Sequence, residues 1–324
     1  MKHPFSITVI LILLFVAAQL TGLYLVSKSI TEVTIVEGNV TLAHSSTAIG
    51  ERPQLHGYQS FLYLFIGVAI GTALLLLLVR FKQVRFWKLW FLIAVWLATT
   101  IALGVLLPQL VALALALLLA LFKVFKPNPV VHNLTEILMY AGIAVLLVPI
   151  FDLFWIIMLL LLVSVYDFIA VWKTKHMVSM AKFQMESVFA GLALPKRQDS
   201  AETARAATKA ALRTATKKTD AKTTAATAKS VKPTTATPPG RSFAILGGGD
   251  VAFPLLFAGV VLESLVAGGF PKGAAFLLTL AVPAFAAVAL TLLLFLAKKD
   301  RFYPAMPFLT AGCLAGWAVT LLLV

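Results

Sequence analysis

The chain has 324 residues, of which 60% are hydrophobic and only 12% are charged, and its mean hydropathy is +0.96. A soluble domain cannot bury that much apolar surface, so the composition predicts a polytopic membrane protein. The net charge of +14 could suggest a nucleic-acid partner, but residues 173–242 carry 14 Lys and Arg against 4 Asp and Glu, about +10 of the total. We therefore expect no nucleic acid. The single cysteine, Cys313, excludes an internal disulfide.

Nine apolar segments have the length and composition of membrane-spanning helices. In chain order they cover about 4–26, 58–79, 86–107, 109–125, 134–151, 153–172, 243–267, 273–297 and 303–324. The first could instead be a signal peptide, but its roughly 23 residues favour a spanning helix. The fourth is short and follows the third after only Pro108 and Gln109, so a fused or re-entrant pair stays open. The predicted fold is an all-α membrane protein with nine transmembrane helices.

The basic residues predict the orientation of this bundle. Connections rich in Lys and Arg alternate with connections poor in them, and the rich ones are expected in the cytoplasm. The rich connections carry Arg80, Lys82, Arg85 and Lys88, then Lys123 and Lys126, then the basic stretch 173–242, then Lys298, Lys299 and Arg301. This pattern predicts a cytoplasmic N-terminus and, after nine spans, a C-terminus outside.

The long basic connection divides the chain into three parts. Residues 1–172 hold the first six helices, residues 173–242 form a cytoplasmic loop, and residues 243–324 hold the last three helices. Within the loop, 174–195 carries apolar residues at near-helical spacing among charges, which predicts an amphipathic helix on the membrane surface. Residues 196–240 are mostly Ala, Thr, Lys and Arg, a composition typical of disorder.

Several other polar and small residues have simpler interpretations. Gly67 and Gly71 form a small-xxx-small pattern, which favours close helix packing within the bundle. Glu136 and Asp152 fall at predicted helix ends and are expected at the interface, while Glu263 is expected to reach the outer interface. The five histidines fall in loops or at helix ends. No His and Cys cluster has metal-ligand spacing, so we expect no metal and no other cofactor.

Two acids lie inside predicted spans. Asp167 is about five residues before the cytoplasmic end of the sixth helix, and Asp250 is about seven residues into the seventh from the same side. Both therefore lie roughly 8–12 Å below the cytoplasmic interface. Charges at this depth are costly and are candidates for function. Two facing carboxylates share a proton, so one can activate water while the other polarises a carbonyl. A proton-sharing contact between helices, or two separate polar cavities, would also explain them.

Short motifs surround these acids and begin the last helix. They are Tyr166-Asp167, Leu246-Gly247-Gly248-Gly249-Asp250 and Pro304-Ala305-Met306-Pro307. In this order, and on the sixth, seventh and ninth spans, they resemble the presenilin and signal peptide peptidase family of intramembrane aspartyl proteases, and its archaeal presenilin homologues most of all. The resemblance covers the whole nine-helix plan. It implies that Asp167 and Asp250 are the catalytic pair and that the other residues of these motifs position the substrate.

The resemblance also implies the partners. Substrates would be single-span membrane proteins in the lipid bilayer, and the cell membrane is the expected location; a homo-oligomer stays open. A cytoplasmic N-terminus resembles presenilin rather than signal peptide peptidase, which implies substrates whose helix runs from an outer N-terminus to a cytoplasmic C-terminus. Met306 stands where the family has Leu, and Gly248 where it often has Leu.

Glycines beside Asp250 suit the approach of an extended substrate. Residues without Cβ allow irregular backbone, and Ser242–Leu246 could pair with an unwound substrate as a β-strand. Two alternatives use the same acids. A proton-coupled transporter would use them as a relay, although the chain lacks the expected repeat. A prepilin-type peptidase shares the Gly-x-Gly-Asp motif but not the motif that begins the ninth span.

Overall fold

The computed structural model describes residues 5–36, 39–52, 55, 57–81, 84–126, 128–171, 191–195, 243–296 and 303–324. The chain divides into two compact units, one of residues 1–193 with 245–324 and one of residues 194–244. All of the described helices belong to the first unit. Most of the predicted amphipathic segment 174–195 lies outside the described residues, as do Ser242 and all of 196–240.

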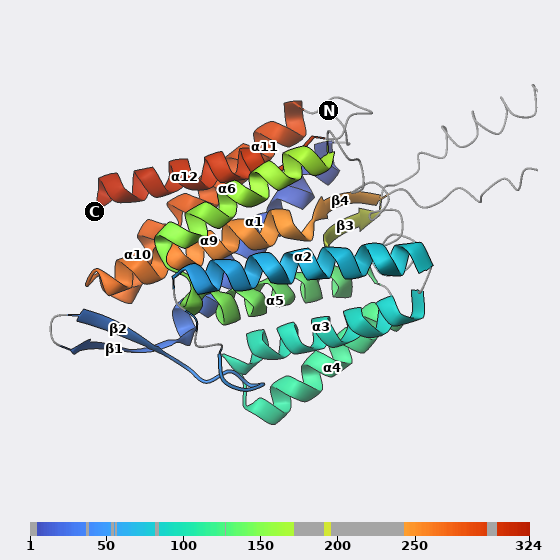
Figure 1. The fold of residues 1–324 in the computed structure, drawn as a ribbon, viewed down its shortest axis with the longest axis horizontal. Coiled ribbons are helices and arrows are strands. Elements are labelled where there is room, and N and C mark those ends of the chain that lie inside the picture. The colour runs from blue at the N-terminus through green and yellow to red at the C-terminus, as the bar shows by residue number, and fades with distance from the viewer. Residues whose placement is uncertain are drawn as a thin grey trace, which may run out of the picture. The chain divides into compact units, whose positions relative to one another are not determined.

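The described elements are mainly helices (Figure 1). The helices are α1 (Phe5–Ser29), α2 (Tyr58–Phe81), α3 (Val84–Gly104), α4 (Gln109–Phe125), α5 (Pro129–Leu147), α6 (Leu153–Ile169), α9 (Gly248–Ala267), α10 (Lys272–Thr279), α11 (Ala281–Leu296) and α12 (Met306–Leu323). A short 3-10 helix, η1 (Val148–Ile150), follows α5. Among the described residues seven helical segments are long and apolar enough to cross a membrane, with α10 and α11 counted together. The helices α4 and α6 are apolar but have 17 residues each, so a count of nine crossings stays a prediction.

Helix α9 lies at the centre of the helical unit. Of its most apolar 18-residue window 72% is buried, whereas the corresponding figure for α2 is 0%. Around α9 pack α1, α5, α6, α10, α11 and α12 (Figure 1). In a membrane protein, apolar side chains on peripheral helices face lipid, so the exposed apolar surface of α2 is expected. The central position of α9 places its N-terminal turn, which contains Asp250, among several neighbouring helices.

The connection between α1 and α2 contains a β-hairpin that the sequence did not suggest. Strands β1 (Ile30–Val36) and β2 (Asn39–His44) pair antiparallel, with Val33 opposite Leu42. His44 Nε2 lies 2.7 Å from Glu263 Oε1, so Glu263 has a specific partner on β2. Lys272 also donates to the carbonyl of Ile30, at 2.6 Å. The hairpin is thus attached to the end of α9 that is remote from Asp250.

Three predicted helix boundaries are wrong for local reasons. Helix α5 begins at Pro129 rather than near residue 134, because Asn128 accepts the Val130 N–H at 2.9 Å and Pro129 suits the first helical position. The segment 243–267 is not helical throughout: Phe243–Gly247 forms strand β4, which pairs with β3 (Gly191–Pro195). The segment 273–297 is divided at Leu280, three residues before Pro283, which lacks the N–H that a continuous helix needs.

The glycine pattern on α2 does not mark a packed interface within this unit. A Cβ added at Gly67 or at Gly71 would meet nothing within 4 Å, so the prediction of close packing there is wrong. The close approaches occur at other glycines. A Cβ at Gly142 would lie 1.8 Å from the Ala98 carbonyl oxygen, where α5 crosses α3, and one at Gly316 would lie 2.6 Å from the Ala281 carbonyl oxygen. Backbones approach this closely because the glycine has no side chain and its partner is an alanine with a small one.

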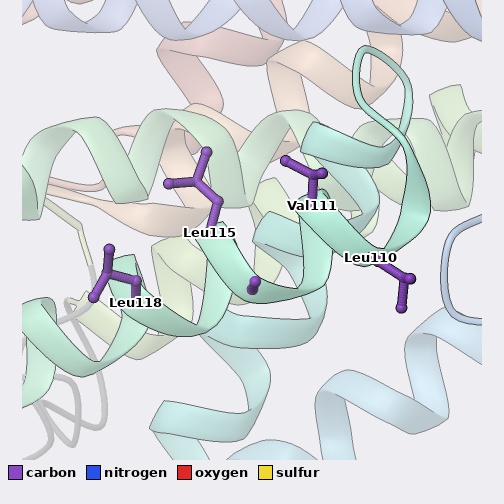
Figure 2. Close-up of a pocket in the computed structure, with 5 residues that line it drawn as sticks. Leu110, Val111, Leu115 and Leu118 are labelled. Atoms are coloured by element: carbon purple, nitrogen blue, oxygen red, sulfur yellow. The ribbon is translucent and has the colours of Figure 1, made fainter.

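Helix α4 has a wide apolar face at the surface of the unit. Figure 2 shows a shallow hollow on it, lined by Leu110, Val111, Ala114, Leu115 and Leu118. Leu110 is 80% exposed, and every lining residue comes from this one helix. No polar side chain enters the hollow, so it has the character of a lipid-facing surface rather than of a reaction site.

Candidate active site

Asp167 is held between α6 and the start of α12. Its side chain is only 5% exposed, and its Oδ2 accepts the backbone N–H of Met306 at 3.1 Å. The backbone amide of Ala305 is a second hydrogen-bond donor to the same carboxyl group. One turn earlier on α6, Ser164 Oγ lies 2.7 Å from Thr310 Oγ1 of α12. Residues three apart share a helix face, so these contacts fix the Asp167 side of α6 against α12.

Asp250 lies in the first turn of α9. Its carboxyl group is hydrogen-bonded to the backbone of Gly247, the residue that caps this helix. An acid at this position faces the backbone N–H groups that the first turn leaves unpaired, and the helix dipole favours its negative charge. Asp167 and Asp250 also lie close enough to interact electrostatically. The two acids that the sequence predicts at similar depth are therefore within electrostatic range of each other.

Two of the three glycines before Asp250 are in close contacts. A Cβ at Gly247 would lie 3.0 Å from Asp250 Oδ2, and a Cβ at Gly248 would lie 3.0 Å from the hydroxyl oxygen of Tyr140. A Cβ at Gly249 would only reach Phe253, at 3.6 Å, which is an ordinary contact. The lack of a side chain thus matters at Gly247 because of Asp250 itself, and at Gly248 because of a tyrosine on another helix.

The remaining predicted motif residues differ in burial. Leu246, Pro304 and Met306 are buried, Ala305 and Pro307 are half-buried, and Tyr166 is 41% exposed. Helix α12 begins at Met306, with Pro307 in its first turn, so Pro304 and Ala305 precede the helix. This arrangement leaves the Met306 N–H free of an intrahelical partner and available to Asp167.

Sequence reasoning missed a buried polar group beside this site. Glu136 was expected at the interface, but it is 0% exposed and receives hydrogen bonds from Lys123 and from the hydroxyl of Tyr140. Lys123 was counted among the cytoplasmic loop charges, but its side chain is fully buried. The sequence signal that could have predicted this burial was a lysine and a glutamate inside apolar stretches, whose opposite charges can neutralise each other.

Gln19 of α1 is a second missed residue. Its side chain is 0% exposed, and its Nε2 donates to the carbonyl of Val251 at 2.8 Å. Val251 follows Asp250 directly, so this hydrogen bond joins α1 to the first turn of α9. A lone glutamine in the apolar run 4–26 was the only sequence signal for it.

The site offers carboxylates and backbone amides. In the described part of the chain, no three His, Cys, Asp or Glu side chains gather in a way that could hold a metal ion. The chemistry available is that of two interacting carboxyl groups, both hydrogen-bonded to the backbone. Such a pair can exchange a proton with a water molecule and with a substrate carbonyl.

Comparison with known proteins gives the family. The model of the family described as "Signal-peptide peptidase, presenilin aspartyl protease" matches residues 21–324. The chain belongs to this family of aspartyl proteases. It is therefore an intramembrane-cleaving aspartic endopeptidase and a multi-pass membrane protein, whose substrates are membrane proteins in the bilayer. No match is found among the curated proteins.

Solved structures of presenilin-family proteases share its fold. One crystal form of "a presenilin family intramembrane aspartate protease", in space group C222, has a TM-score of 0.56 and 17% sequence identity, covering 98% of this chain and 99% of that chain. A second form, in space group P2, has a TM-score of 0.55 and 17% identity, covering 97% of each chain. At this identity the likeness concerns the fold, and it extends over nearly the whole of this family member.

Proposed function

We propose that Asp167 and Asp250 are the catalytic pair of this protease, and that they hydrolyse peptide bonds within the transmembrane segments of single-span substrates. The observation that carries the proposal is the electrostatic interaction of Asp167 with Asp250 at the start of the central helix α9, with Asp167 held by the Met306 N–H at 3.1 Å. Opposing carboxyl groups in a site of low dielectric are able to share one proton.

The reaction then needs no covalent bond between the substrate and the enzyme. The ionised carboxylate takes a proton from water as the water oxygen bonds to the substrate carbonyl carbon, while the protonated carboxyl group gives its proton to the carbonyl oxygen. The resulting tetrahedral diol collapses when the carboxyl group that took the water proton passes it to the amide nitrogen, the other carboxylate takes back a hydroxyl proton, and the carbon–nitrogen bond breaks. The products are a new carboxyl terminus and a new amino terminus, and the pair again holds one proton.

The motif residues position the substrate in this proposal. A peptide bond within a helix is shielded by its own hydrogen bonds, so the substrate must be unwound near Asp250. The strand Phe243–Gly247 directly precedes α9 and is suited to hold an extended segment by backbone pairing. Gly247, Gly248 and Gly249 keep the approach to Asp250 free of side chains. Pro304, Ala305, Met306 and Pro307 present backbone groups beside Asp167.

The proposed orientation follows from the basic connections. We place the N-terminus in the cytoplasm and the C-terminus outside, with nine crossings of the cell membrane. Substrates would then present their N-terminus outside. Lys123 no longer supports this orientation, because it is buried, but the neighbouring Lys126 and the other basic connections still do.

Hydrolysis is tested with purified protein in liposomes and a fluorescent single-span substrate. The masses of the cleavage products are determined by mass spectrometry. We expect new termini inside the apolar segment of the substrate. Proton-driven uptake is measured in the same liposomes, because a transporter using the same acids would also need both of them. Uptake that requires both acids, without cleavage of any substrate in a panel, would overturn the proposal.

A further inference from the structure

A row of buried, hydrogen-bonded polar side chains extends from α4 to the N-terminal end of α9, where Asp250 lies. Lys123 Nζ donates to Glu136 Oε1, and the Tyr140 hydroxyl donates to Glu136 Oε2. Lys123 and Glu136 have fully buried side chains, and Tyr140 is 2% exposed. Lys123 Nζ also lies 5.2 Å from the centre of the Phe91 ring on α3. Both carboxylate oxygens of Glu136 are therefore occupied, and its charge is balanced by Lys123.

This row of buried polar side chains ends beside Gly248. The Tyr140 hydroxyl oxygen would lie 3.0 Å from a Cβ at position 248, and the ring atoms Cε1 and Cζ would lie 3.5 and 3.6 Å from it. Tyr140 is also within electrostatic reach of Asp250. The tyrosine hydroxyl thus fills the space that a side chain at position 248 would need, two residues before Asp250.

The hydrogen bond to Glu136 fixes where this hydroxyl lies. A tyrosine has a single O–H to donate, and Glu136 takes it, so the ring is held at one rotation and the oxygen lies against Gly248. A buried carboxylate without Lys123 would be too costly to serve as this acceptor. Among the described residues, Tyr140 interacts electrostatically with Glu136 and with Asp250, and Asp250 interacts with Asp167.

We propose that Tyr140 is a positioning residue for Asp250: held by Glu136 and Lys123, its hydroxyl sets the first turn of α9 through its contact with Gly248. The proposal rests on the proposed function, because it assigns the purpose of the contact to a catalytic Asp250. It also explains the glycine at 248 in this chain, since even one added carbon there would press on a hydroxyl that cannot move away.

The test is a cycle of four proteins: the wild type, Gly248→Ala, Tyr140→Phe and the double variant. Gly248→Ala is expected to lower kcat about 10-fold with little change in KM, because a small displacement of a catalytic group is costly. In the double variant the added methyl group takes the place of the missing hydroxyl against the first turn of α9, because the nearest ring atom is at an ordinary contact distance from it. We therefore expect the double variant to regain most of the kcat that Gly248→Ala loses.

The controls separate positioning from folding. Gly71→Ala adds a methyl group at a helix position with open space around it, and should leave kcat and the unfolding midpoint near the wild type. The proposal would be overturned if the fold-decreases in kcat of the two single variants multiplied in the double variant. It would also be overturned if Gly248→Ala had the kcat of the wild type. It would also be overturned if kcat merely followed the unfolding midpoint across the cycle. Retained cleavage in Asp250→Asn would instead refute the proposed function itself.

Discussion

Replacing Asp250 by Asn should lower kcat by about 10²–10⁴-fold, and replacing Asp167 by Asn should do the same. The amide has nearly the same shape as the carboxyl group, but it can neither take a proton from water nor be ionised. The rates are measured by single-turnover cleavage of a single-span substrate in detergent, with enzyme in excess.

Both variants should remain folded. In Asp167→Asn the amide oxygen can still accept the Met306 N–H, which the wild-type carboxylate accepts at 3.1 Å. In Asp250→Asn the same oxygen can accept from the Gly247 backbone, so the helix cap is kept. Loss of activity with an unchanged unfolding transition would therefore be a loss of chemistry.

Asp152→Asn is the matched control on α6. Asp152 stands at the opposite end of this helix from Asp167, is exposed, and accepts the Gly57 N–H at 3.1 Å. The substitution removes one negative charge from the same helix and keeps that hydrogen bond. We expect near wild-type cleavage. A comparable loss of rate in Asp152→Asn, or full activity in either variant of the proposed pair, would refute the assignment.

Replacing Lys123 by Met is expected to lower the free energy of unfolding by about 3–5 kcal/mol. The substitution keeps the apolar stem but leaves the Glu136 carboxylate buried without a cation, since both side chains are fully buried. The measurement is reversible chemical unfolding in detergent micelles. Attraction between buried charges is offset by the cost of removing them from water, so the pair itself adds little net stability.

The double variant Lys123→Met and Glu136→Met should therefore be much more stable than Lys123→Met alone. One cost remains, because the Tyr140 hydroxyl loses its acceptor, and an unsatisfied buried donor costs about 1–3 kcal/mol. If the double variant were less stable than Lys123→Met, the ion pair would not be the source of the loss. Near wild-type stability of Lys123→Met would show that Glu136 is not buried as an ion.

Much of the site could be predicted from the sequence because its acids are anomalous. Asp167 and Asp250 stand out in apolar stretches, and their spacing from the ends of those stretches gives similar depths. The partners of the acids could not be predicted, because the Met306 N–H and the Gly247 backbone are available only where helices begin. Those beginnings depend on the exact residues at which α9 and α12 start.

The errors share one physical cause, which is that burial is a tertiary property. Lys123 was assigned to a cytoplasmic connection and Glu136 to the interface, because a single charge near a helix end usually lies outside the bundle, and only their pairing allows burial. Gly67 and Gly71 have the spacing of a packed interface, but α2 presents them to open space, while Gly142 packs closely without such a motif. The β1–β2 hairpin was missed because it lies in a connection between two spans, and the apolar pattern that marks the spans carries no information about such a connection.

The proposed catalytic pair can be tested directly by binding a peptide that mimics the tetrahedral state. A peptide with a secondary hydroxyl in place of the scissile carbonyl is compared with the same peptide carrying a methylene group there. The wild type should bind the hydroxyl peptide at least about 10²-fold more tightly, because the hydroxyl takes the place of the water held between the two carboxyl groups. In Asp167→Asn and in Asp250→Asn this preference should disappear. Equal affinity of the wild type for the two peptides, or a preference that persists in either variant, would contradict the pairing of Asp167 with Asp250.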